Sequence, residues 1–111
     1  MKVANRIKAN EDFVSTVRKG RALKSLSYIV HFRQNELDIC RIGISVSKKI
    51  GIAVTRNRVK RQIRAMCDSL VNYSLHAFDV VVVVKADYLS KSYQENLEIL
   101  QKLFKEIGIT E

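Results

Sequence analysis

Residues 48–64 read "KKIGIAVTRNRVKRQIR" and contain seven cationic side chains and no acidic one. From about Thr55 to about Tyr73, apolar residues recur at spacings of four, three and four, which predicts an amphipathic helix. The apolar stripe of this helix consists of Val59, Ile63, Met66 and Leu70. The basic side chains fall on the other side, because successive helical residues are rotated by about 100°. The helix should therefore be anchored by one face and expose a basic surface with the other.

The segments around this helix are predicted to be strands. Residues 26–33 alternate with a period of two, and residues 37–47 do so after a turn at "RQNE". We expect these two strands to form an antiparallel pair with one face on the core and the other more polar. The later segment "FDVVVVVKAD", residues 78–87, is a continuous β-branched run, which indicates a strand covered on both faces.

Two more helices complete the pattern. Asn10 can cap a first helix that begins with Glu11 and Asp12 and ends at Gly20. The last helix opens with "SYQE", a capping-box sequence at residues 92–95. Its apolar stripe and its terminating glycine are Leu97, Leu100, Phe104, Ile107 and Gly108. The order of helix, strands, basic helix, buried strand and helix predicts an α/β sandwich around a single sheet.

Composition points to one domain with a localised charge. A chain of 111 residues that is 47% hydrophobic can bury a core, and we expect residues 1–111 to form a single domain. The net charge is +9, and residues 48–64 supply seven of these charges. The remaining 13 bases are nearly balanced by 11 acids, as expected if one surface binds a polyanion. The longest apolar run, Val80–Val84, cannot span a bilayer and no signal peptide is visible, so we expect a soluble cytoplasmic protein.

No catalytic or metal-binding constellation is visible in the sequence. The two histidines, His31 and His76, have no nucleophile or carboxylate at a spacing typical of a catalytic set, and no phosphate-binding loop is present. Cys40 and Cys67 are far apart and form no metal-ligand motif, which favours buried thiols. We therefore expect neither catalytic residues nor protein-bound metal in this chain.

The clustering of cations on one helix is unfavourable in isolation. Arg56 and Arg64 each lie four residues from Lys60, and like charges at this spacing destabilise a helix, to the order of 1 kcal/mol over the whole cluster. The helix macrodipole also disfavours cations in the first turns. A solvated charged face is the alternative, but such faces usually alternate in sign. A bound polyanion reverses both penalties, and arginine binds phosphate with two parallel hydrogen bonds.

The same residues resemble a known signature. "RNRVKRQIR", preceded by "KKIG", is similar to the arginine-rich motif of the bacterial ribonuclease P protein subunit. The segments "NEDF" at residues 10–13 and "RIGISVSKK" at residues 41–49 occur in the family's order, as does the valine strand before a Leu-rich helix. The resemblance implies a small subunit whose partners are the ribonuclease P RNA and precursor tRNA. In this family the RNA subunit is the catalyst, uses Mg²⁺, and removes the 5′ leader to give the mature tRNA end.

The resemblance also implies which residues contact RNA. Those that should face the RNA subunit are Lys48, Lys49, Arg56, Asn57, Arg58, Lys60, Arg61 and Arg64. The leader should lie in a cleft between the first helix and the sheet, along Phe13, Val17, Ile29, His31 and Arg33. Val17, His31 and Ile52 depart from the residues that relatives often carry there, namely a second aromatic residue, a tyrosine and an asparagine.

The fold implied by the resemblance has the order αβββαβα, a mostly antiparallel sheet, and a left-handed crossover at the basic helix. It is similar to the second domain of ribosomal protein S5, and the protein alone should be a monomer. A structural RNA-binding protein of the ribosome, without turnover, is the competing hypothesis. A DNA-reading helix is a weaker one, because the sequence shows no second recognition unit or dimer signal.

Overall fold

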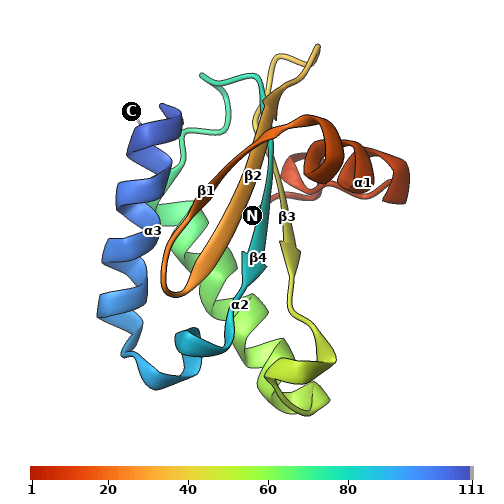
Figure 1. The fold of residues 1–111 in the computed structure, drawn as a ribbon. Coiled ribbons are helices and arrows are strands. Elements are labelled where there is room, and N and C mark those ends of the chain that lie inside the picture. The colour runs from red at the N-terminus through yellow and green to blue at the C-terminus, as the bar shows by residue number, and fades with distance from the viewer. Residues whose placement is uncertain (111) are drawn as a thin grey trace.

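The structure is a computed structural model that describes residues 1–110 (Figure 1). Three helices and four strands follow one another in the order αβββαβα, as expected. Their bounds are α1 Asn10–Lys19, β1 Arg21–Lys24, β2 Tyr28–Gln34, β3 Arg41–Ser45, α2 Ala53–Leu70, β4 Phe78–Val84 and α3 Tyr93–Ile107. Single 3-10 turns lie at Val3–Asn5, Lys48–Ile50 and Ala86–Ser90. Within residues 1–110, no helix combines the length and apolarity that crossing a membrane requires.

The four strands form one sheet in the order β1-β2-β4-β3. β2 is antiparallel to both β1 and β4, whereas β3 runs parallel to β4. The expected direct pairing of β2 with β3 is therefore wrong, because β4 lies between them. Alternation of side chains shows that a strand has one polar face, but it does not identify the neighbouring strand. The continuous valine run takes the central position, where both faces are covered.

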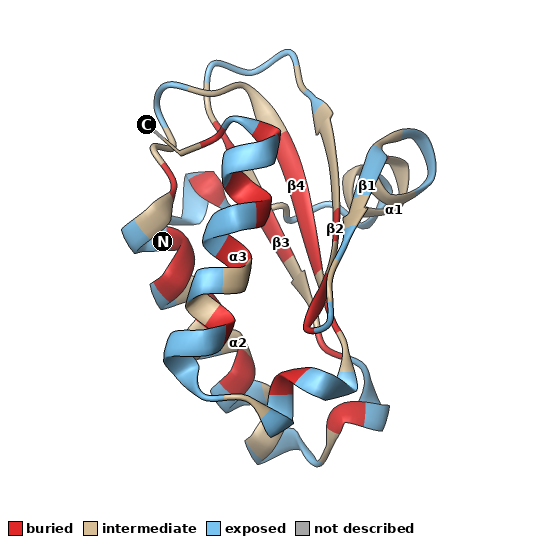
Figure 2. Ribbon diagram, turned by 60° about the vertical axis from the view of Figure 1, so that its left-hand side comes forward, coloured by how far each residue is buried: buried red, intermediate tan, exposed pale blue. Residues whose placement is uncertain are grey.

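The connection from β3 through α2 to β4 joins neighbouring parallel strands. In Figure 2, α2 and α3 lie on the near face of the sheet, β3 and β4 run downward, and β4 lies to the right of β3. This arrangement is a left-handed crossover, as the family resemblance implies. Such connections are right-handed in about 98% of proteins.

The hydrophobic core lies between the sheet and the helix pair α2 and α3, and α1 covers the opposite face (Figures 1 and 2). From α2, the predicted stripe residues Val59, Ile63 and Met66 are fully buried, whereas Leu70 is half-buried. The strands contribute Tyr28, Val30, Ile42, Val80 and Val82, and α3 contributes Leu100 and Phe104. The basic helix is thus anchored as its sequence predicts.

The two predicted helix starts have different outcomes. The Ser92 hydroxyl accepts a hydrogen bond from the Glu95 amide at 3.1 Å, and the Ser92 amide donates to Glu95 Oε1 at 3.0 Å, so the capping box is confirmed. At α1, the expected Asn10 cap is wrong, because Asn10 is already the first helical residue and Ala9 precedes it. The Ala9 carbonyl accepts the first helical bond, from the Phe13 amide at 3.2 Å.

Gly20 ends α1, as expected, but for a reason of packing. Its amide donates to the Thr16 carbonyl at 3.0 Å, and its φ of −78° is accessible to any residue. A Cβ atom at Gly20 would lie 2.5 Å from the Thr16 oxygen and 2.6 Å from the Phe32 oxygen. A glycine is therefore needed where α1 meets β2, and the chain continues directly into β1, to which the sequence analysis assigned no residues.

Candidate RNA-binding surface

The outer side of α2 carries the basic residues. Asn57, Arg58 and Arg61 are exposed, as are Lys48 and Lys49 in the turn that precedes the helix. Arg56, Lys60 and Arg64 are half-buried, with their positions on the flanks of the helix. Since the apolar stripe fixes the rotation of the helix, these side chains are held together on one surface. We call this set of eight residues the α2 surface.

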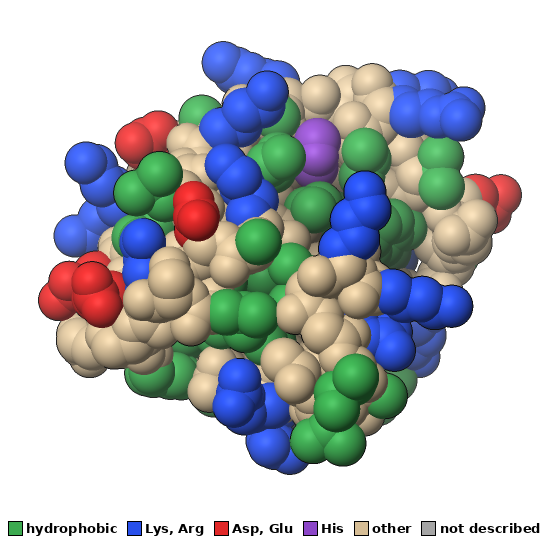
Figure 3. Space-filling model, turned by 60° about the horizontal axis from the view of Figure 1, so that its bottom comes forward, with side chains coloured by type: hydrophobic (Ala, Val, Ile, Leu, Met, Phe, Trp, Pro, Cys, Tyr) green, Lys and Arg blue, Asp and Glu red, His purple; other side chains and the backbone are tan. Residues whose placement is uncertain are grey.

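The cations of the α2 surface have no acidic partner in the part of the chain that the structure describes. The ion pairs there join Met1 to Asp68, Arg41 to Asp12 and Arg41 to Asp79. Figure 3 views the end of the molecule where α2 begins, and lysine and arginine side chains surround a partly apolar centre, with most acidic ones on the left. The positive charge of the α2 surface is thus available to an external anion, and charge-assisted bonds to phosphate are among the stronger hydrogen bonds.

Two apolar side chains lie next to these cations. Ile52 is 73% exposed and Val54 is 75% exposed, at the start of α2. Nucleic-acid bases present apolar faces beside their charged backbone, so a surface that mixes cations with apolar groups can contact both parts of a nucleotide.

On the opposite face of the sheet, α1 crosses the strands. The Phe13 ring lies against Gly43 of β3, where an added Cβ would be 3.0 Å from the ring atoms Cδ2 and Cε2. Gly20, at the other end of α1, lies against Phe32 of β2. Val17 is half-buried between these two ends, and α1 therefore spans the width of three strands.

The β2 residues of the expected leader cleft share the α1 face. Ile29, His31 and Arg33 alternate with core residues of β2, and all three are half-buried. Burial, and secondarily the charge of Lys24, lowers the pKa of His31 below its ordinary value of 6.5. His31 is therefore neutral at neutral pH and presents a flat ring that can donate and accept hydrogen bonds.

The structure brings the two predicted sets of residues together at one place. A small hollow of about 150 Å³ is lined by Phe13 of α1 and by Lys60 and Arg64 of α2. Arg6, from the segment before α1, lines the same hollow, and the sequence analysis did not single it out. Phe13 is thus adjacent to the α2 surface, whereas Arg33 lies farther along the sheet and lines a different hollow.

A second group that sequence reasoning missed supports the α1 face. Arg41 of β3 donates to both carboxylate oxygens of Asp79 in β4, at 2.9 and 2.7 Å, and contacts Asp12 of α1 at 3.5 Å. Asn35 donates to Asp79 Oδ1 at 2.9 Å. The hydrogen bond with Asp79 raises the pKa of Arg41. The sequence contains one sign of this ion pair: Asp79 lies inside a valine strand, and a buried carboxylate requires a partner.

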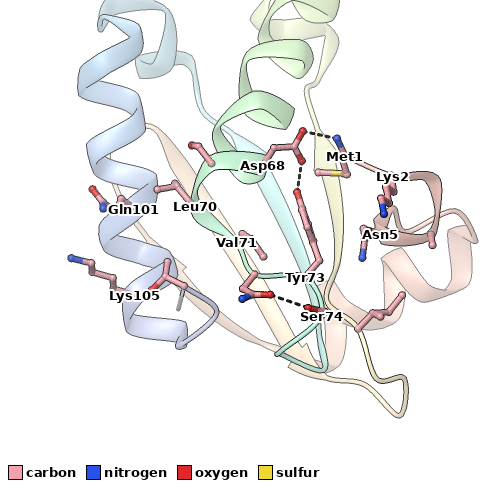
Figure 4. Close-up of a pocket in the computed structure, with 15 residues that line it drawn as sticks. Met1, Lys2, Asn5, Asp68, Leu70, Val71, Tyr73, Ser74, Gln101 and Lys105 are labelled. Carbon is pink, nitrogen blue, oxygen red and sulfur yellow. Dashed lines mark hydrogen bonds and ion pairs between the residues drawn. The ribbon is translucent and has the colours of Figure 1, made fainter.

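Another hollow of the described chain is lined by polar groups that bond to one another. A hollow of about 960 Å³ lies between the ends of α2 and α3 (Figure 4). Its acid, Asp68, accepts hydrogen bonds from the amino group of Met1 at 2.5 Å and from the Tyr73 hydroxyl at 2.8 Å. The Ser74 hydroxyl likewise donates to Asn72 at 3.1 Å. Within residues 1–110, no three His, Cys, Asp or Glu side chains are placed to hold a metal ion.

The cysteines offer no nucleophile at neutral pH. Cys40 and Cys67 are both free and fully buried. Burial raises the pKa of Cys40 to about 12 and raises that of Cys67 as well. Fold and surface together define a small basic α/β protein whose second helix presents an exposed cluster of cations.

Comparison with known proteins identifies the family. The sequence model described as Ribonuclease P matches residues 1–108. The ribonuclease P protein component of Mycoplasma capricolum is 34% identical over 108 residues, with 96% of this chain and 99% of the relative covered. That of Streptococcus pyogenes is 37% identical over 105 residues, with 95% and 87% covered. The chain belongs to the ribonuclease P protein family.

Solved structures agree with this assignment. The ribonuclease P protein of Staphylococcus aureus superposes with a TM-score of 0.84 at 32% identity, over 96% of this chain and 98% of that one. The protein from Thermotoga maritima gives 0.79 at 28% identity, over 91% and 96% of the two chains. The family role is that of the protein component of an endoribonuclease complex.

Proposed function

We propose that this chain binds the RNA subunit of ribonuclease P through the α2 surface and the 5′ leader of precursor tRNA on the α1 face of the sheet. In this role it assists the endonucleolytic removal of the leader that gives the mature tRNA 5′ end. Membership of the ribonuclease P protein family supports the role as a subunit. The structure supports the division of the two binding surfaces.

The observation that carries the proposal is the absence, in the described part of the chain, of acidic partners for the cations of the α2 surface. An exposed cluster of like charges on a rigid helix raises the free energy of the free protein. Phosphates of a structured RNA neutralise these cations and so relieve the repulsion. The bound cations in turn displace counterions from the RNA. The cluster is therefore explained by RNA binding, and a merely solvated helix face does not explain it.

The leader is proposed to contact the α1 face because that face offers one aromatic ring, one imidazole and one guanidinium. Phe13 can stack on a base, and His31 and Arg33 lie on the neighbouring strand β2. The small hollow at Phe13, Lys60 and Arg64 joins this face to the α2 surface. A leader that emerges from the RNA subunit would therefore meet Phe13 first.

The chemistry of cleavage is assigned to the RNA subunit with its Mg²⁺ ions. The residues of this chain bind and orient the substrate, and the basic side chains reduce the repulsion between the leader and the RNA subunit. Positioning of this kind lowers the barrier without any catalytic side chain, because bound reactants lose less entropy on reaching the reactive geometry.

Reconstitution tests the proposal. The purified chain is mixed with a ribonuclease P RNA and a precursor tRNA at low Mg²⁺ concentration, and correct 5′ cleavage is measured against the RNA alone. We expect clear stimulation, whereas a ribosomal RNA-binding protein that shares the fold would give none. A leaderless tRNA provides the control for leader binding, since its affinity should not depend on the protein's α1 face.

A further inference from the structure

A hollow of about 730 Å³ lies at the end of the sheet where α1, β1, β2, β4 and α3 meet, and we call it the end hollow. In Figure 1, this is the upper end of the sheet, where the chain passes from α1 into β1 beside β2. The family role does not account for it, because no residue of α2 lines it, whereas Glu106 and Ile107 of α3 do. Its lining combines a basic rim with an aromatic floor.

The aromatic floor consists of Phe32 and Phe78. Their ring centroids are 6.3 Å apart, with the planes tilted by 56°. Both side chains pack against the core on one side and keep part of their surface exposed. Arg21 pairs with Phe32 across β1 and β2, and its guanidinium carbon lies 5.9 Å from the centre of the Phe32 ring. A guanidinium held over a ring keeps its N–H groups free to bind phosphate.

The rim is positively charged. Lys19, Arg21 and Arg33 line the end hollow with one acid, Glu106. None of these four takes part in an ion pair within residues 1–110. The Nε atom of Arg33 is buried and has no hydrogen-bond acceptor among the described residues. An unsatisfied charged donor costs free energy in the free protein, so an anion that reaches Arg33 gains more than an ordinary surface contact.

Two partly exposed aromatic rings beside cations that form no ion pair within residues 1–110 fit a nucleotide of single-stranded RNA. Bases stack on aromatic rings with little sequence preference, and the phosphate binds to neighbouring arginines. Arg33 connects the end hollow to the α1 face, because it lines the end hollow and follows His31 on the same side of β2. Since Phe13 lies next to the α2 surface and Arg33 lies at the far end, the leader would reach the end hollow last.

We propose that the end hollow binds one unpaired nucleotide of the 5′ leader, upstream of the part that contacts Phe13 and His31. The base lies against Phe32 and Phe78, and its phosphate contacts Arg21 and Arg33. This inference rests on the proposed function, since it requires that the leader follows the α1 face.

The first test compares leaders of different lengths in the reconstituted enzyme. Precursor tRNAs with graded leaders are bound by wild-type enzyme and by enzyme with Arg21→Ala. For wild-type enzyme, we expect the affinity for precursor tRNA to increase when the leader becomes long enough to reach the end hollow. In Arg21→Ala enzyme, this increase in affinity should be about fivefold smaller. The matched control is Lys102→Ala, which removes one exposed charge from α3 outside the end hollow and leaves the gain intact.

The second test locates the RNA directly. Gln34 is exposed and lines the end hollow, and the two native cysteines are buried. A photoreactive group attached to Gln34→Cys should therefore cross-link to upstream leader nucleotides of a bound precursor tRNA. Cross-links to the RNA subunit instead, or an Arg21→Ala effect that is equal for all leader lengths, overturn the inference while leaving the proposed function standing. Failure of the wild-type protein to stimulate cleavage overturns the proposed function itself.

Discussion

Arg41 and Asp79 form a two-pronged ion pair that ties β3 to β4, with Nε–Oδ1 and Nη2–Oδ2 distances of 2.9 and 2.7 Å. The Asp79 side chain is only 3% exposed and that of Arg41 is 18% exposed. Arg41 also contacts Asp12 of α1 at 3.5 Å, so the pair links the sheet to the helix that carries Phe13. The ion pair therefore helps to hold α1 and the strands of the α1 face in position.

Replacement of Arg41 tests this support. Arg41→Ala leaves the Asp79 carboxylate buried with Asn35 as its remaining side-chain donor. We expect the free energy of unfolding to fall by about 3 kcal/mol, because breaking a buried pair strands a charge. Urea denaturation measures it. Asp12→Asn, which removes only the longer contact of a carboxylate that is 38% exposed, should cost less than about 1 kcal/mol. Equal losses for the two variants would show that the pair with Asp79 is not the main contribution.

Removal of cations from the α2 surface separates binding from folding. Arg58 and Arg61 are exposed and make no ion pair within residues 1–110. Arg58→Ala with Arg61→Ala should weaken binding to the RNA subunit and reduce the slope of log affinity against log salt concentration by about 1.4 to 1.8. The melting temperature should not fall, because the substitutions remove two exposed charges that repel each other. The pair Lys102→Ala and Lys105→Ala, exposed on α3, is the control and should leave the slope as it is.

Much of this surface could be predicted from the sequence because it depends on local rules. The rotation of α2 follows from Val59, Ile63 and Met66, whose spacing fixes the buried side and therefore also the basic side. The capping box at Ser92 and the buried strand of valines are equally local. Each of these features is encoded within a few turns of one element.

Features that depend on contacts between distant segments could not be predicted in this way. The sequence places Arg41 and Asp79 on strands without saying that the strands are adjacent, and the order β1-β2-β4-β3 depends on the crossover through α2. The short strand β1, with one half-buried residue in four, lacks the alternation that marks a strand. The contact between Phe13 and Gly43 and the end hollow likewise form only when α1 crosses the folded sheet.

The histidine on the α1 face predicts a pH dependence. Burial, with a smaller effect of Lys24, lowers the pKa of His31 in the folded protein below 6.5. As the pH falls from above 6.5 to below this lowered pKa, the unfolded chain takes up a proton that the folded chain does not, so the free energy of unfolding decreases. We expect this decrease to be smaller for His31→Gln, as measured by urea denaturation at several pH values. An identical pH dependence for both proteins would contradict the burial of His31.

The same histidine reports on leader binding. A phosphate close to His31 favours the protonated ring and raises its pKa. Titration of the His31 ring signals by nuclear magnetic resonance, with and without a leader oligonucleotide, should therefore show a higher pKa in the complex. The ring signals of His76, which lies in the loop after α2, are the internal control and should not move when the oligonucleotide is added.

The contact between Phe13 and Gly43 predicts a defect in leader binding from a single methyl group. In Gly43→Ala, the added Cβ would lie 3.0 Å from two atoms of the Phe13 ring, which is too close, so the ring has to move away from the sheet. A displaced ring stacks less well on a base, and a base–aromatic stack contributes about 1 to 3 kcal/mol. We expect the affinity of the reconstituted enzyme for precursor tRNA to fall, with no change for leaderless tRNA.

A second glycine separates this effect from a loss of stability. Gly108 has a φ of +89° and no atom within 4 Å of an added Cβ, so Gly108→Ala strains the backbone without touching a neighbour. Each of the two substitutions should lower the free energy of unfolding by about 1 to 2 kcal/mol, for different reasons. Only Gly43→Ala should reduce the affinity for the leader, because only Gly43 sets the position of Phe13. If the two variants bind precursor tRNA equally well, the Phe13 ring does not contact the leader from its position next to Gly43. The proposal that the leader binds along the α1 face would then be wrong.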